Sequence, residues 1–126
     1  MNVPDDLRYT SDHEWARLED SRVRIGITDY AQDALGDVVF VKLPDPGAVV
    51  GLAESISEVE STKSVSDVYA PLAGTVVEIN TELNDAPEKL NEDPYGEGWI
   101  CLIELADPTR FGDLLDAASY RQLIED

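Results

Sequence analysis

The chain has 126 residues, of which 43% are hydrophobic and 29% are charged, so it has enough apolar material for the core of a soluble domain. Its 27 acidic residues against nine basic ones give a formal net charge of −18. Phosphate backbones and anionic lipid surfaces would repel such a chain, which argues against nucleic-acid and membrane partners and favours basic docking surfaces. The acidity is equally consistent with a saline habitat. We expect one domain over residues 1–126, and a monomer.

The composition also indicates a compartment. Cys101 is the only cysteine, so no disulfide can form within the chain, and a reducing environment is favoured. It lies in an apolar run, which predicts a buried core residue in preference to a nucleophile. No apolar run reaches the roughly 18 residues that a membrane span needs. The start of the chain is acidic and lacks the features of a signal or transit peptide. We therefore expect a cytoplasmic protein.

Short β-branched and aromatic runs, separated by turn-forming residues, predict strands along most of the chain. The clearest is residues 23–27, where apolar residues alternate and one face should be buried. The expected strands are residues 15–18, 23–27, 38–41, 49–50, the two segments on either side of Lys63, 76–79 and 99–105. Residues 80–98 read as one long polar connection with two prolines and two glycines.

Two helical segments are expected. Residues 29–35 form a short helix, because Thr28 or Asp29 can cap its start and Gly36 stands where a helix-ending glycine belongs. Its inward stripe should consist of Tyr30, Ala34 and Leu35. Pro108 opens a helical tail over about 108–125, in which these apolar residues fall at helical spacing: Phe111, Leu114, Leu115, Tyr120, Leu123 and Ile124.

Two hexapeptides, residues 36–41 and 74–79, share the pattern G-x-V-V-x-[VI]. Each is followed by a polar connection that contains proline. The repeat fits two similar half-sheets stacked face to face, with a turn around Lys63 between them. Many short strands with frequent turn signals already point to a mainly β sandwich or barrel.

The residues for common enzyme chemistry are missing. His13 is the only histidine, so neither a zinc site nor a Ser-His-Asp site has enough ligands or a choice of base. The sequence also contains no calcium loop, no G-x-S-x-G elbow and no glycine-rich phosphate loop. We therefore expect a protein that is not an enzyme and that holds no metal.

Lys63 is the most distinctive side chain. The chain has only three lysines, and this one sits among small hydroxyl residues and carboxylates between two expected strands. The neighbouring Glu60 and Asp67 favour the charged ammonium, which is a poor nucleophile. An amine at the tip of a turn can, however, enter the active site of another enzyme. Lys63 is therefore a better candidate for enzymatic acylation than for Schiff-base catalysis.

A resemblance to a known family follows from this stretch. Residues 58–71, EVESTKSVSDVYAP, resemble the lipoylation hairpin of the glycine cleavage H proteins. The similarity continues in chain order through residues 13–15, 26–32, 35–41, 43–44, 74–80 and 91–99. It implies a mainly β, lipoyl/biotinyl-type barrel–sandwich hybrid of two antiparallel sheets, with a short helix near 29–35, a lipoyl hairpin over about 56–70 and a C-terminal helical tail. It also implies lipoate in amide linkage on Lys63.

The resemblance implies a carrier in glycine catabolism and one-carbon metabolism. The lipoyl group would accept the methylamine of glycine from a pyridoxal-phosphate glycine decarboxylase and present it to an aminomethyltransferase that uses tetrahydrofolate. A dihydrolipoamide dehydrogenase would reoxidise the arm, and lipoate-attaching enzymes would install it. The cofactor supplies the reactive sulfur, and the protein supplies presentation and protection.

The loaded arm ends in a cationic aminomethyl group, which family members are thought to hold against a cleft of their own. By the resemblance, Glu14 and Asp67 match the positions that would hold the amine, and Asp12 is a third candidate. His13 is expected to be a structural anchor of the N-terminal segment. The chain departs from the pattern at Ala34, where some members carry a histidine proposed to contact the arm, and around Lys63 at residues 62, 64 and 65.

Three alternatives stay open at this point. They are a protein that passes lipoyl groups to other acceptors, an unmodified interaction module, and an enzyme that uses Lys63 directly. A biotin carrier is disfavoured, because Lys63 lacks the flanking methionines of biotinyl domains.

Overall fold

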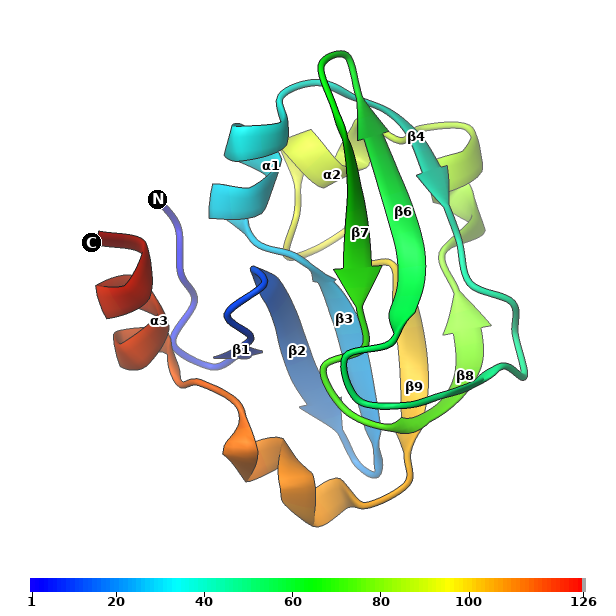
Figure 1. Ribbon diagram of the computed structural model, residues 1–126, viewed down its shortest axis with the longest axis vertical. Coiled ribbons are helices and arrows are strands. Elements are labelled where there is room, and N and C mark those ends of the chain that lie inside the picture. The colour runs from blue at the N-terminus through cyan, green and yellow to red at the C-terminus, as the bar shows by residue number, and fades with distance from the viewer. Residues whose placement is uncertain (126) are drawn as a thin grey trace.

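The computed structural model describes residues 1–125, so residue 126, the end of the expected domain, lies outside the described part. Two antiparallel sheets form the body of the molecule (Figure 1). The mainly β architecture with two antiparallel sheets, a short helix and a helical C-terminal segment is therefore confirmed. Within residues 1–125, no helix has the length and apolar character needed to cross a membrane.

The larger sheet has six strands in the order β1-β2-β3-β9-β8-β5, and the smaller has three in the order β4-β6-β7. The strands of the larger sheet are β1 (Arg8–Tyr9), β2 (Glu14–Glu19), β3 (Arg22–Ile27), β9 (Cys101–Leu105), β8 (Gly74–Ile79) and β5 (Val49–Val50). Those of the smaller sheet are β4 (Val38–Lys42), β6 (Ser55–Ser61) and β7 (Val65–Tyr69). The two G-x-V-V hexapeptides do fall in different sheets, on β4 and β8. The halves are nevertheless unequal, because the larger sheet also contains β1, β2 and β3 from residues 8–27.

The core lies between the sheets and receives the alternating apolar residues of both. Representative members are Val23, Ile25, Val41, Val59, Val76 and Ile103. Cys101 belongs to this core and is completely buried, as the sequence predicted. Burial raises the pKa of its thiol to about 12. Gly26 is explained by packing, because a Cβ there would lie 2.7 Å from the Trp15 ring that covers it.

A second apolar cluster ties the two ends of the chain together. It contains Val3, Leu7, Tyr9, Trp15, Ala117 and Tyr120. The rings of Tyr9 and Tyr120 stack with centroids 4.6 Å apart. In Figure 1 the C-terminal helix and the N-terminal segment accordingly lie beside each other at one side of the molecule.

The C-terminal tail differs from the single helical run that the spacing predicted. A 3₁₀ helix, η2 (Pro108–Asp113), is followed by three non-helical residues, 114–116, and then by α3 (Ala117–Glu125). The interruption arises at Leu115, whose backbone N–H and C=O both bond to Tyr9, at 2.9 and 2.8 Å. The chain pairs with β1 at this point and does not continue as a helix. The sequence did not predict β1, because this strand is only two residues long.

The connection over residues 80–98 also contains structure that the sequence reading missed. It holds a 3₁₀ helix, η1 (Thr81–Asn84), and one turn of helix, α2 (Lys89–Glu92). Both are anchored by a single buried leucine, Leu83 and Leu90 respectively. An apolar pattern needs several residues to be recognised, so elements with one buried residue give no periodic signal.

The helix α1 (Asp29–Leu35) has the predicted bounds. Thr28 is its cap, because Thr28 Oγ1 accepts a hydrogen bond of 3.2 Å from the Ala31 N–H. Gly36 ends it with a φ of +81°, a conformation that favours glycine. The predicted inward stripe was right only at Leu35, which packs against the core together with Ala31. Ala34 is exposed, and the half-buried Tyr30 packs on the His13 ring.

Candidate functional site

Lys63 lies at the tip of the hairpin formed by β6 and β7, which projects at the top of Figure 1. Five cross-strand pairs hold the hairpin, from Ser55 opposite Tyr69 to Glu60 opposite Val65. The turn closes with a hydrogen bond of 2.8 Å from the Ser61 N–H to the Ser64 C=O. Residues 62–67 are exposed, so the Lys63 amine is accessible from outside the molecule.

The aliphatic stem of Lys63 crosses the end of α1. A Cβ placed on Gly36 would lie 3.3 Å from Lys63 Cε and 3.8 Å from Nζ. The loop between α1 and β4 also contacts the tip directly, because the Thr62 N–H donates to the Asp37 C=O at 3.0 Å. Lys63 therefore stands beside the helix end, at one end of the space between α1 and β7.

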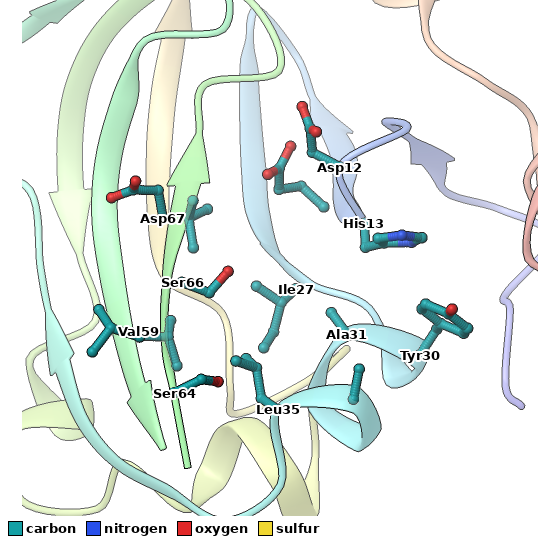
Figure 2. A pocket seen from close by; sticks show the side chains of 14 residues that line it. Asp12, His13, Ile27, Tyr30, Ala31, Leu35, Val59, Ser64, Ser66 and Asp67 are labelled. Atoms are coloured by element: carbon teal, nitrogen blue, oxygen red, sulfur yellow. The ribbon is translucent and has the colours of Figure 1, made fainter. Parts of the chain in front are cut away.

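That space is a cleft of about 260 Å³ with largely apolar walls (Figure 2). One wall is α1 and the other is β7, and Ile27 lies between them. Val59 of β6 also lines the cleft. The lining residues that point into it from the walls include Ala31, Leu35 and Ser66. Asp12 lies at the end of the cleft opposite Ser64 and the hairpin tip. Glu14 also lines the cleft, and its contact with the Tyr69 N–H places it at the end of β7 that is distant from the tip.

Glu14 is the unusual residue of this site. Its side chain is only 2% exposed, and within residues 1–125 no cationic group forms an ion pair with it. Its carboxyl oxygens accept hydrogen bonds from the Thr10 hydroxyl at 2.6 Å and from the Tyr69 N–H at 3.2 Å. Burial raises the pKa of Glu14 to about 7, although these hydrogen bonds pull it down. The cleft thus contains a buried acid that lacks a countercharge.

The three acids named from the sequence are not equally placed. Asp12 and Glu14 line the cleft from the strand end of β2. Asp67 also borders it, but its carboxylate points away toward β6, where the Ser55 hydroxyl donates to it at 3.2 Å. Side chains alternate along a strand, so Ser66, which the sequence reading did not single out, takes the position that faces the cleft. The alternation is informative only together with the hairpin register, which buries Val68 and so places Ser66, two residues earlier, on the same face.

His13 occupies a strained position next to the cleft, with a φ of +69°. Its Nδ1 lies 2.8 Å from the Tyr120 hydroxyl, and its ring packs on Tyr30 with centroids 4.6 Å apart. Burial lowers the pKa of His13. The Tyr120 hydroxyl also bonds to Thr28 Oγ1 at 2.7 Å, so α3 reaches the cap of the helix that forms the cleft wall.

Asn91 supports the other end of α1, and the sequence reading gave it no role of its own. Its amide donates to the Gly36 C=O at 2.8 Å and to Gln32 Oε1 at 3.1 Å, and its side-chain oxygen accepts from the Val38 N–H at 2.9 Å. These bonds fix the point where the Lys63 stem meets the helix. Asn91 lies more than 50 residues from its partners, so no local pattern reveals the contact.

Comparisons with known proteins agree with this arrangement. A sequence model of the family described as "Glycine cleavage H-protein" matches residues 7–126. The glycine cleavage system H protein of Nocardia farcinica is 59% identical, with 97% of this chain and 96% of that protein covered. The H protein of Anaeromyxobacter sp. is 54% identical, over 100% of this chain and 98% of that protein.

The fold agrees as well. The crystal structure of a glycine cleavage system H protein from Mycobacterium marinum superposes with a TM-score of 0.90 at 44% sequence identity, covering 98% of this chain and all of that one. The lipoyl-type barrel–sandwich fold expected from the hairpin motif is therefore confirmed. Full-length similarity of this degree leaves one conclusion: the chain belongs to the glycine cleavage H-protein family, the non-catalytic lipoyl carriers of the glycine cleavage system.

Proposed function

We propose that Lys63 is the residue that carries the lipoyl group of this carrier. The observation that supports it most directly is the placement of one exposed amine on a tight hairpin tip, next to the mouth of an apolar cleft. The other lysines fit less well. Lys42 lies within β4, and Lys89 forms ion pairs with Glu97 at 3.0 Å and Glu92 at 3.7 Å.

The cleft fits the arm that this role requires. Its walls are apolar, which suits an aliphatic chain, and its far end holds a buried carboxyl without a countercharge, which suits a terminal cation. When bound, lipoate supplies a dithiolane whose sulfur accepts the aminomethyl group. The protein's own contribution is then to exclude water from that group and to hold its ammonium.

The residues that hold the ammonium are proposed to be Glu14, with Asp12 beside it and Asp67 as a third candidate. Glu14 is the strongest of the three, because a cation would give its buried carboxylate the partner that it lacks. Asp67 would first have to leave its hydrogen bond with Ser55. A buried pair of this kind contributes more than an exposed ion pair, for which about 0–1 kcal/mol is typical.

The carrier works with the other components of the glycine cleavage system. The specific partners that we propose are the pyridoxal-phosphate glycine decarboxylase, the tetrahydrofolate-dependent aminomethyltransferase, the dihydrolipoamide dehydrogenase and a lipoate-attaching enzyme. The net charge of −18 supports basic docking surfaces on these partners. A monomer of one domain in the cytoplasm, with its lone thiol buried, remains our prediction.

Intact-mass measurement tests the attachment site. Protein produced in a host that supplies lipoate should gain one lipoyl increment, and Lys63→Arg should abolish the gain. Lys42→Arg, at another exposed lysine, is the matched control and should keep it. If the mass increment survives Lys63→Arg and disappears with Lys42→Arg, the lipoyl group is attached to Lys42 and our proposal is wrong.

A second experiment tests the proposed ammonium site. Glu14→Gln keeps the shape of the side chain and removes its charge, so the aminomethylated carrier should lose its one-carbon unit faster than wild type does. Glu58→Gln, on an exposed position of β6, is the control and should have no effect. Equal lifetimes for Glu14→Gln and wild type would refute the role of Glu14, while lipoylation of both would leave the role of Lys63 standing.

A further inference from the structure

The turn that presents Lys63 is organised around one hydroxyl group, that of Ser61. Ser61 Oγ accepts hydrogen bonds from the backbone N–H of Ser64 at 3.1 Å and of Lys63 at 3.3 Å. It also lies 3.2 Å from the Ser64 C=O, to which it donates. A serine hydroxyl can donate once and accept twice, so Ser61 uses its full hydrogen-bonding capacity on this one turn.

These bonds matter because the other hydrogen bonds that hold the backbone of the tip are donated by residues 61 and 62, before Lys63. The residues with positive φ in residues 1–125 are His13, Asp20, Ala53, Gly36 and Gly47, so the Lys63 turn uses neither a glycine nor a left-handed residue. Its backbone amides at Lys63 and Ser64 face the Ser61 side chain and bond to it. Without that side chain the two amides would turn to water, and the turn would lose the contacts that select one conformation.

The tip is held on its other side by the body of the protein. The Thr62 N–H donates to the Asp37 C=O at 3.0 Å, in the loop that follows α1. Lys63 is thus bracketed by a backbone bond at residue 62 and by the Ser61 hydroxyl at residues 63 and 64. Its backbone is therefore held from both sides, while its side chain is exposed.

We propose that Ser61 is a positioning residue for the acylation of Lys63, because its hydroxyl pre-orders the turn that an acylating enzyme must accept. The inference rests on the proposed attachment at Lys63. In the step itself, Nζ loses a proton and attacks the carbonyl carbon of an activated lipoyl donor, an acyl adenylate or a thioester. The C–N bond forms as the adenylate or thiol leaves. A turn that is already ordered removes the entropy cost of ordering it in the enzyme's active site.

The experiment measures lipoylation rates with a lipoate ligase, lipoate and ATP, at several concentrations of the unlipoylated carrier. Ser61→Ala should lower kcat/KM by about tenfold, which is what the loss of a few exposed hydrogen bonds provides. Ser61→Thr keeps the hydroxyl and should restore most of the rate. Thr62→Ala is the neighbouring control, because within residues 1–125 the Thr62 side chain forms no hydrogen bond, and it should behave as wild type.

Two further measurements separate positioning from a general loss of structure. Hydrogen exchange of the Lys63 and Ser64 amides should become faster in Ser61→Ala, and the melting temperature should stay close to that of wild type, because the turn is exposed. Wild-type rates for Ser61→Ala, or an equal loss in Thr62→Ala, would overturn the inference. Wild-type protein that gains no lipoyl increment would instead refute the attachment at Lys63, so the two failures are distinguishable.

Discussion

The protonation of Glu14 should make the stability of the protein depend on pH in a way that a single substitution can isolate. Glu14 is buried, the charge of Asp12 adds to the rise in its pKa, and the groups that bond to it are the neutral Thr10 hydroxyl and Tyr69 N–H. Burial raises its pKa from 4.5 to about 7 in the folded protein. Glu14→Gln removes the titration and keeps a side chain of nearly the same volume.

The sign follows from proton binding in the two states. Below about pH 4.5 the folded and unfolded chains both hold the proton of Glu14. Between about pH 4.5 and pH 7 the unfolded chain loses it while the folded protein keeps it, so the free energy of unfolding falls as the pH rises. Above pH 7 the loss in unfolding free energy that Glu14 causes no longer changes with pH. At 1.36 kcal/mol for each pKa unit, it amounts to about 3 kcal/mol.

The assay is urea unfolding of wild type and Glu14→Gln at a series of pH values from 4 to 8. At each pH we expect the unfolding free energy of the two proteins to fall with urea concentration at roughly equal slopes. Other carboxylates titrate in both proteins and cancel in the difference. Relative to Glu14→Gln, wild type should lose about 3 kcal/mol of unfolding free energy between pH 4.5 and pH 8. A difference that stays constant with pH would refute the reasoning, because Glu14 would then have the same pKa in both states.

Three more substitutions have defined outcomes. Lys63→Arg should change the free energy of unfolding by no more than about 0.5 kcal/mol, because the residue is exposed; thermal unfolding checks this, and a larger loss would make Lys63 structural. Asn91→Ala should destabilise by about 1–3 kcal/mol in urea unfolding, since Gly36 and Val38 lose their partner. Tyr120→Phe should cost a similar amount, about 1–3 kcal/mol, because Thr28 loses a buried partner; an unchanged midpoint would mean that water replaces the hydroxyl.

Local patterns were sufficient for the parts of the fold that repeat over several residues. The alternation in residues 23–27 predicted β3, and the cap at Thr28 with Gly36 at the other end predicted α1 within its true bounds. Elements that depend on distant backbone pairing were not predictable in this way. The break at Leu115 arises because Leu115 pairs with Tyr9, more than 100 residues away, and β1, which pairs with β2, is too short at two residues to show an alternating pattern.

The same distinction between local and distant contacts applies to the candidate site. The residues around Lys63 are contiguous, so their motif identified the hairpin from sequence alone. The wider resemblance to the family also named Glu14 and Asp67 together, but it gave no orientation for either side chain. The pleat of β7 turns Asp67 toward Ser55 and gives the inward position to Ser66, a distinction that requires the register of the hairpin.

The burial of Cys101 also protects the chemistry of the carrier. A dithiolane is opened by thiolates, and the attacking species must be both ionised and accessible. Cys101 is completely buried and its pKa is raised to about 12, so almost none of it is thiolate at neutral pH and none of it reaches the surface. The protein's own thiol therefore cannot attack and open the dithiolane of a lipoyl arm on this protein. The redox state of the arm is left to the enzymes that it visits.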